Sequence, residues 1–184
     1  MRLYFHTDRA GSLRECDVIE NRVYPNGNAV GVLCPVIGEE FAAHIQQMFS
    51  RGISYHGYNY LVSSLTGEKS FSSWAIEIYF EYIRFKHYPD KPSRFESFFC
   101  WETFDDAQDF ARSENQRYSI YEVSNEGPYF ITDMNLLKLD FNPVKQEENA
   151  RKYWLGEPMD GDLSYKAKWE YLVSTSIKVI RRVI

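Results

Sequence analysis

The stretch that most constrains the fold is WEYLVSTS, Trp169–Ser176, near the C-terminal end of the chain. Bulky side chains at every second position alternate there with smaller or polar ones, a period typical of a β-strand. Residues two apart share a face, so Glu170 is expected opposite Trp169, Tyr171 and Val173. If the bulky face packs on the core, the Glu170 carboxylate faces a groove or solvent. On residue type alone, an ordinary solvent-facing glutamate is the commoner outcome.

The remaining patterns predict a mixture of strands and helices. Further strands are expected at Arg2–Thr7, Val18–Val23, Phe95–Trp101, Tyr118–Val123, Tyr129–Asp133 and Ile177–Ile184. Helices are expected at Glu39–Arg51, Ser70–His87, Asp105–Ser113 and Glu147–Trp154. The last strand is expected to pair with Trp169–Ser176, and Gly52–Gly67 favours no single element. Since the order shows no regular βαβ alternation, the sequence predicts an α+β fold, one domain over residues 1–184.

Composition narrows the class of protein. Hydrophobic residues make up 44% and charged residues 26%, which is ordinary for a soluble globular domain. The net charge of −5 argues against a broadly basic nucleic-acid-binding surface. The three cysteines are too widely spaced for a zinc motif or a disulfide framework, which favours a reducing compartment. With no membrane-length apolar run and no signal peptide, a cytoplasmic protein is expected, including one delivered into a target cell's cytosol.

Common catalytic motifs do not occur. The chain has no P-loop, no Gly-rich dinucleotide turn and no HExxH, and no metal is expected. Cys100 is expected to be a core residue. Two carboxylate pairs, Glu77 with Glu81 and Glu147 with Glu148, are expected to be solvated helical charges rather than catalytic acids.

Three short motifs remain, in a fixed order along the chain. LYFHTD carries His6 and Thr7, SFFCWETFDDAQDFA carries Ser97, Phe98 and Phe99, and WEYLVSTS carries Glu170. In order and spacing they resemble the ADP-ribosyltransferase superfamily, on its diphtheria-toxin and poly-ADP-ribose-polymerase side. That family has a histidine on its first core strand, an aromatic residue on a middle strand that enters a helix, and a glutamate on a late strand.

Two departures from the family pattern stand out. The middle aromatic residue is usually tyrosine, whereas this chain offers Phe98 or Phe99, and spacing leaves both open. Ser97 fits the Arg-Ser-Glu variant of the superfamily, but Lys168 occupies the position where that variant has a second glutamate.

The resemblance implies a split β-sheet core with flanking helices and NAD as co-substrate. Glu170 is then the catalytic carboxylate, because a fixed negative charge stabilises the positive charge that develops on the ribose. His6, with Thr7 beside it, is assigned to the ribose hydroxyls and one phenylalanine to the nicotinamide. Arg94 suits the pyrophosphate. These assignments require His6 and Glu170 to lie beside one sugar.

The leading hypothesis is therefore a small mono-ADP-ribosyltransferase, a toxin or effector, with a protein acceptor favoured over a nucleic acid and an antitoxin or immunity protein as a further partner. An NAD-dependent RNA 2′-phosphotransferase would need a basic pocket that the sequence does not indicate. From another class, the chain could be a non-catalytic protein-interaction module, such as an immunity protein. Stabilisation by NAD separates the two classes, because a ligand that binds only the folded state must stabilise it.

Overall fold

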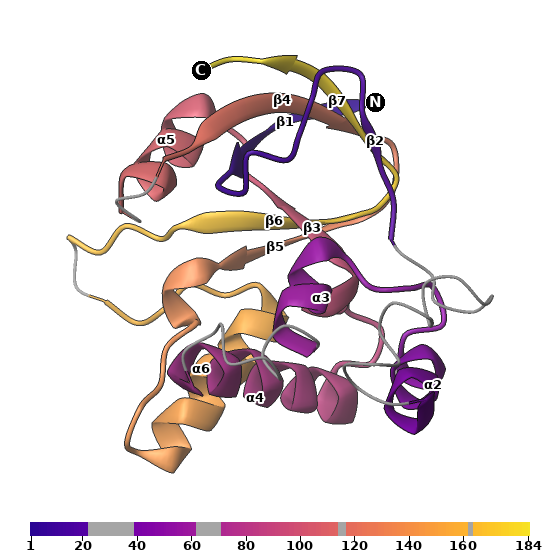
Figure 1. Cartoon of the computed structure of the whole chain (residues 1–184). Helices are drawn as coiled ribbons and strands as arrows, with labels where there is room; N and C mark the ends of the chain where they lie inside the picture. Colours follow the sequence, from indigo (N-terminus) through magenta and orange to yellow (C-terminus); the bar gives the residue numbers. More distant parts are fainter. Residues whose placement is uncertain (22–38, 62–70, 114–116, 162–163) are drawn as a thin grey trace.

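Two antiparallel sheets form the centre of the computed structural model, which describes residues 1–21, 39–61, 71–113, 117–161 and 164–184 (Figure 1). The larger sheet has the order β1-β4-β7-β2, with bounds Arg2–Asp8, Ser119–Asn125, Ile177–Arg182 and Val18–Ile19. The smaller has the order β3-β6-β5, with bounds Ser97–Cys100, Trp169–Ser174 and Tyr129–Asp133. The predicted α+β fold is confirmed.

The two sheets are joined where β3 meets β1. Trp101, one residue beyond β3, forms a bridge with Phe5 through two backbone hydrogen bonds of 2.8 and 2.9 Å. In space, the strands therefore follow one another as β5-β6-β3-β1-β4-β7-β2. The three strands that carry the sequence motifs, β6, β3 and β1, are consecutive in this order.

One predicted strand pairing is wrong. The last two strands lie in different sheets, β6 beside β3 and β5, and β7 beside β4 and β2. The short link between them crosses from sheet to sheet, and the Asn125 side chain donates to the carbonyls of Ser174 and Ser176. The apolar residues of β7, Ile177 and Val179, then pack between the sheets, which a hairpin with β6 would prevent.

Within the described ranges, four α-helices agree with prediction and one was not predicted. The expected helices are α2 (Glu39–Met48), α4 (Phe71–His87), α5 (Phe104–Ser113) and α6 (Pro143–Leu155). The additional helix α3 (Tyr55–Leu61) lies in the stretch for which the sequence favoured no element. Of the predicted second strand only Val18–Ile19 is formed among the described residues, and residues 22–23 lie outside them. In the described part of the chain, no helix combines the length and the apolar character needed to cross a membrane.

Helix α6 begins earlier than predicted because its start is marked by polar signals. The Asn142 side chain accepts from the backbone N–H groups of Val144 and Lys145, and Pro143 occupies the first turn, where a missing N–H costs nothing. The helix ends at Gly156, as predicted, in the left-handed conformation with φ of 74°.

The helices α4 and α6 lie against the smaller sheet, on the side away from the larger one (Figure 1). Their buried side chains Phe80, Tyr153 and Trp154 pack on Leu172 of β6. On the other face of β6, Tyr171 and Val173 pack on the larger sheet. The central strand is therefore buried on both faces, and the expectation that one face is open to a groove or solvent is wrong.

The register of β6 is fixed by a buried carboxylate at the end of β5. Asp133 is fully buried and accepts hydrogen bonds from the backbone N–H groups of Asn135, Met159 and Lys168 at 3.0 to 3.1 Å. The Tyr165 hydroxyl donates to the same carboxylate. Because Lys168 is two residues before Glu170, this anchor sets which face of the sheet Glu170 occupies.

Candidate functional site

Glu170 lies at the junction between the smaller sheet and the helices α4 and α6. It shares the face of Leu172, and its residue is only 4% exposed. Its Oε1 accepts a hydrogen bond of 2.6 Å from Arg94 Nη1 and another of 2.6 Å from the Tyr153 hydroxyl. Both bonds that Glu170 accepts from described side chains end on this one oxygen.

Arg94 stands at the centre of the cluster. It begins a 3₁₀ turn, Arg94–Glu96, whose N-cap Ser93 accepts from the Phe95 N–H, and this turn leads directly into β3. Its guanidinium donates to both oxygens of Glu77 on α4, at 2.8 and 3.0 Å, in the planar two-point geometry typical of arginine. A third nitrogen, Nη1, donates to Glu170 and to the Tyr153 hydroxyl.

The cluster brings two carboxylates to one guanidinium. Burial raises the pKa of Glu77, but Arg94 and His56 more than offset that effect and hold it well below its usual range. Burial lowers the pKa of Arg94, yet Glu170 and Glu77 raise it well above its ordinary value. Glu77 and Arg94 are therefore both charged near neutral pH.

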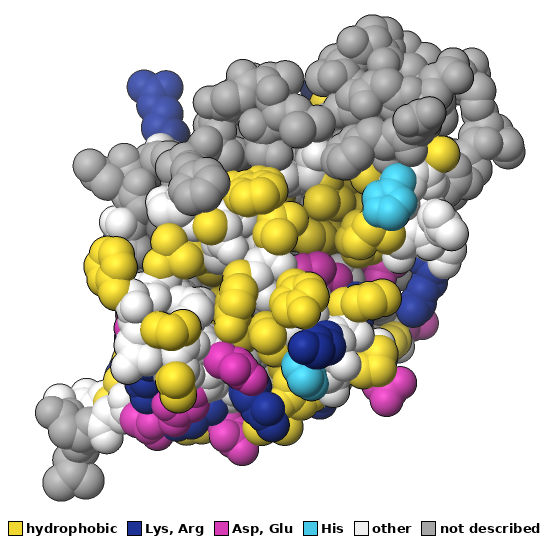
Figure 2. Space-filling model, turned by 90° about the horizontal axis from the view of Figure 1, so that it is seen from below, with side chains coloured by type: hydrophobic (Ala, Val, Ile, Leu, Met, Phe, Trp, Pro, Cys, Tyr) yellow, Lys and Arg dark blue, Asp and Glu magenta, His cyan; other side chains and the backbone are white. Residues whose placement is uncertain are grey.

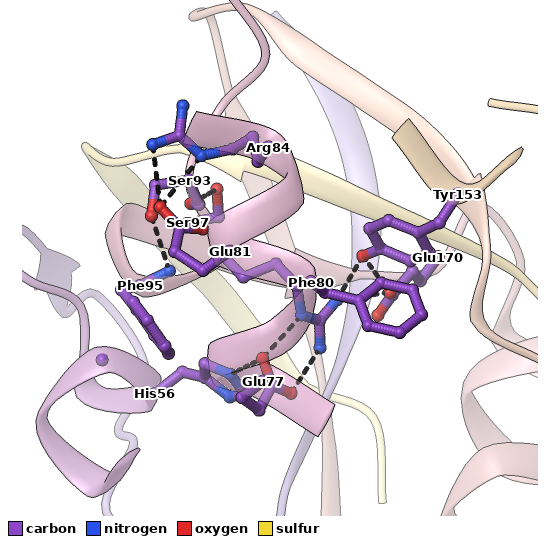
Figure 3. Close-up of polar contacts among 12 residues, drawn as sticks. His56, Glu77, Phe80, Glu81, Arg84, Ser93, Phe95, Ser97, Tyr153 and Glu170 are labelled. Carbon is purple, nitrogen blue, oxygen red and sulfur yellow. Dashed lines mark hydrogen bonds and ion pairs between the residues drawn. The ribbon is translucent and has the colours of Figure 1, made fainter. Parts of the chain in front are cut away.

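Two further side chains complete the cluster, and Figure 3 shows them directed toward the same centre as Glu77 and Glu170. Tyr153 extends from α6, and burial, together with Glu170, raises the pKa of its phenol well above 10 although Arg94 opposes this. His56 extends from α3, and its Nε2 lies 3.1 Å from Glu77 Oε2. The cluster therefore consists of Glu77, Arg94, Tyr153, Glu170 and His56.

The structure separates the two phenylalanines that the sequence left as alternatives. In the register of β3 and β6, Phe99 is opposite Leu172 and so lies on the face of Glu170, with its ring centroid 4.6 Å from the Arg94 guanidinium carbon. Phe98 is opposite Val173 on the other face, where its ring centroid is 4.2 Å from that of His6. Phe99 is the ring that lies beside the cluster.

His6 and Glu170 are not brought together as the resemblance requires. They lie on β1 and β6, which β3 separates, and they point to opposite faces, so one sugar does not contact both in this arrangement. The link between them is indirect: His6 Nδ1 lies 2.8 Å from the carbonyl oxygen of Phe99. Burial lowers the pKa of His6, although its bond to this carbonyl opposes the effect, so the imidazole is neutral near pH 7.

Thr7 and Ser97 use their hydroxyls within the fold. Thr7 Oγ1 donates to the carbonyl of Ala107 at 3.0 Å and ties β1 to α5. Ser97 Oγ donates to the carbonyl of Ser93 at 2.6 Å and closes the 3₁₀ turn. Both residues are buried, and both bonds are structural in kind.

Sequence reasoning missed three members of the cluster, Glu77, His56 and Tyr153. The prediction that Glu77 and Glu81 are solvated is wrong, because they are 5% and 6% exposed and each is paired with an arginine. The position of Glu77 along α4 could have indicated its burial. Phe80 and Glu81, three and four residues further on, lie on the same helix face and are also buried.

Other sequence predictions about carboxylates and cysteine agree with the structure. The side chains of Glu147 and Glu148 are about half exposed, at 50% and 43%. Cys100 is fully buried, and burial raises the pKa of its thiol well above the ordinary value.

Among the residues described, no three His, Cys, Asp or Glu side chains are grouped so as to hold a metal ion.

Fold and site together define an α+β protein with two antiparallel sheets and a buried carboxylate–guanidinium–phenol cluster where the smaller sheet meets the helices. A family model described as "Protein of unknown function (DUF2441)" matches residues 4–184, and the chain belongs to this family. A search of curated proteins finds no match.

Proposed function

We propose that the protein is an NAD-dependent mono-ADP-ribosyltransferase with Glu170 as its catalytic carboxylate. The observation that carries this proposal is the adjacency of the three motif strands, which lie far apart in the sequence. β6 pairs with β3 along its length, and β3 meets β1 at the bridge between Trp101 and Phe5. Such adjacency is one condition for a site that the three motifs share: Glu170 and Phe99 meet on one face, while His6 lies on the other.

The cluster supplies what cleavage of the nicotinamide–ribose bond requires. As the bond from C1′ to nitrogen breaks, nicotinamide leaves with the electron pair and positive charge develops on the ribose. Glu170 lies on the rigid strand β6, and its carboxylate is held by hydrogen bonds from Arg94 and Tyr153. It therefore stabilises the positive charge on the ribose without reorganising. The acceptor forms the new bond to C1′ and releases its proton to water. Phe99 provides the flat ring beside the reacting sugar.

The remaining predicted residues take modified roles in this proposal. Arg94 holds Glu170 rather than the pyrophosphate, because four of its N–H bonds already go to side chains of the cluster. His6 lies on the opposite face and bonds to the Phe99 carbonyl, so in this proposal it holds β3 and does not contact the sugar. Since Glu170 is 4% exposed, NAD reaches it only after covering side chains move apart, so a conformational step precedes chemistry.

The acceptor we propose is a protein in a cytosol. The net charge of −5 disfavours a polyanionic acceptor, whose binding depends on phosphate neutralisation.

The test uses the full chain with labelled NAD, first alone and then with a cell lysate. We expect NAD hydrolysis, transfer of label to protein, and a rise in melting temperature with NAD. Glu170→Gln should abolish turnover yet keep the fold and NAD affinity, because the amide oxygen still accepts from Arg94 and Tyr153.

Glu81→Gln is the matched control. Glu81 is a carboxylate of α4 with 6% exposure, bonded to Arg84 and outside the cluster. We expect Glu81→Gln to lower the free energy of unfolding and to leave NAD turnover unchanged. Absence of NAD binding, hydrolysis and transfer from the wild-type protein would defeat the proposal, and so would full turnover in Glu170→Gln.

A non-catalytic interaction module is the second candidate, and one surface favours it. Seen from below, the helical side of the molecule displays many hydrophobic side chains (Figure 2). Exposed apolar residues of α4 and α6 include Tyr82 at 54%, Phe85 at 71%, Val144 at 75% and Leu155 at 51%. An unchanged melting temperature at saturating NAD favours this reading.

A further inference from the structure

The bonds of the Tyr153 phenol point to a role beyond packing. The Tyr153 ring is fully buried and meets Phe80 edge-on at 5.3 Å and Trp154 edge-on at 4.8 Å between centroids. The Thr132 hydroxyl donates to the Tyr153 carbonyl at 2.7 Å. Ring and backbone are therefore both fixed, so the direction of the hydroxyl is fixed as well.

That hydroxyl is a permanent donor. Burial raises the pKa of Tyr153, and the neighbouring Glu170 carboxylate raises it further while Arg94 opposes, so the phenol keeps its proton over the working range of an enzyme. A phenol with its proton has one hydrogen to give. It accepts from Arg94 Nη1 and donates to Glu170 Oε1.

Arg94 is directed to the same oxygen by a different constraint. Glu77 binds two nitrogens of the guanidinium, Nε and Nη2, and so fixes the plane of the fork. The remaining nitrogen, Nη1, then meets Glu170 Oε1 at 2.6 Å. Two donors from two helical segments thus converge on one oxygen of one carboxylate.

We infer that Tyr153 is a positioning residue of the proposed transferase, which together with Arg94 and Glu77 holds Oε1 of Glu170 and assigns Oε2 to the substrate sugar. This inference rests on the proposed function. Oε1 of Glu170 already accepts hydrogen bonds from Arg94 and Tyr153. In this inference Oε2 is therefore the oxygen that accepts from a ribose hydroxyl and faces the positive charge that develops on the ribose. Tyr153 itself does not contact NAD.

The test is a double-mutant cycle on steady-state NAD hydrolysis. Tyr153→Phe keeps the ring and its packing but removes the donor. We expect kcat to fall about tenfold to a hundredfold, as for loss of one hydrogen bond to a charged group, with KM for NAD unchanged within about twofold. In the Glu77→Gln background, which keeps the catalytic carboxylate, the same change should cost less than it does in the wild-type protein, because residues that act through one group are not additive.

Tyr171→Phe is the matched control. Tyr171 follows Glu170 on β6, is 4% exposed, and donates its hydroxyl to Glu102 on the opposite face. Removing that hydroxyl should leave kcat unchanged. Glu77→Gln gives a second variant should Tyr153→Phe not fold: it loosens the guanidinium, and a loss in kcat without a change in KM is again expected.

The outcomes distinguish this inference from the function beneath it. Wild-type turnover that Glu170→Gln abolishes and Tyr153→Phe leaves intact overturns the positioning role alone. Equal additive losses in the two backgrounds, or a rise in KM in place of a fall in kcat, also overturn it. A wild-type protein that neither binds nor hydrolyses NAD overturns the proposed function and this inference together.

Discussion

Replacing Arg94 by methionine tests whether the cluster is a coupled electrostatic unit. The substitution keeps an unbranched apolar side chain of moderate length but leaves Glu77 and Glu170 buried without their guanidinium. Removing one partner of a buried ion pair typically costs about 3–5 kcal/mol. Because this guanidinium serves two carboxylates, we expect a loss in the free energy of unfolding of about 5 kcal/mol, against a total of about 5–15 kcal/mol for a domain.

The loss should depend on pH in a defined direction. In the wild-type protein the pKa of Glu77 is depressed on folding, so its contribution is complete above the unfolded value of about 4.3 and disappears only in stronger acid. Without Arg94, burial is the largest remaining influence on Glu77, so we expect its pKa to lie above the unfolded value. The variant then loses up to about 1.4 kcal/mol per pH unit as pH rises through that range.

The assay is urea denaturation of both proteins at pH 5 and pH 7, which avoids the salt of guanidinium chloride. We expect the difference in unfolding free energy to be larger at pH 7 than at pH 5. Arg84→Met is the control, because Arg84 pairs with one carboxylate, Glu81, outside the cluster, and it should cost less. A difference below about 1 kcal/mol, or one equal at the two pH values, refutes the coupled cluster.

Three predictions concern the framework, each checked by chemical denaturation. Gly57→Ala should cost about 1–3 kcal/mol or more, because a methyl group there would overlap the Phe95 carbonyl oxygen, and no loss would contradict the close approach of α3 to the 3₁₀ turn. Asn142→Ala should cost about 1 kcal/mol through loss of the α6 cap, and Asn142→Ser should recover most of it. Trp154→Phe should cost about 2 kcal/mol, since it removes a fully buried indole whose N–H donates to the Phe80 carbonyl; a stability equal to wild type would show that the site recovers its packing.

Local patterns predicted the elements better than they predicted their partners. Period-two alternation located β6, and regular spacing located α4, because both patterns depend on near neighbours in the sequence. Pairing depends on long-range contacts: nothing within Trp169–Ser176 distinguishes a hairpin with β7 from the observed crossing to the other sheet. Helical spacing also leaves open which side chains are buried, since Tyr82 and Phe85 of α4 lie exposed.

The site was predicted in part for a related reason. Residue type and order identified Glu170, Arg94 and a phenylalanine at position 98 or 99, and the structure brings Glu170, Arg94 and Phe99 together. Tyr153 and Glu77 come from helices whose sequences contain no motif, so only tertiary packing reveals them. The sequence alone could not show whether His6 and Glu170 share a face. Their strands, β1 and β6, are joined through β3, and the bridge between Phe5 and Trp101 determines which residues of β1 and β6 lie on the same face.

The composition of the cluster argues for function over stability. Removing two carboxylates and a guanidinium from water costs several kcal/mol per ion, and a well-packed apolar replacement is often as stable or more so. A sequence optimised for stability alone would not need a buried guanidinium shared by two carboxylates, since each buried ion costs free energy unless it is paired. Local rules are broken mainly where a protein needs a charged group held in place. Glu170 satisfies that description: it is the carboxylate of the pair that Arg94 binds through one nitrogen, while Glu77 takes the other two.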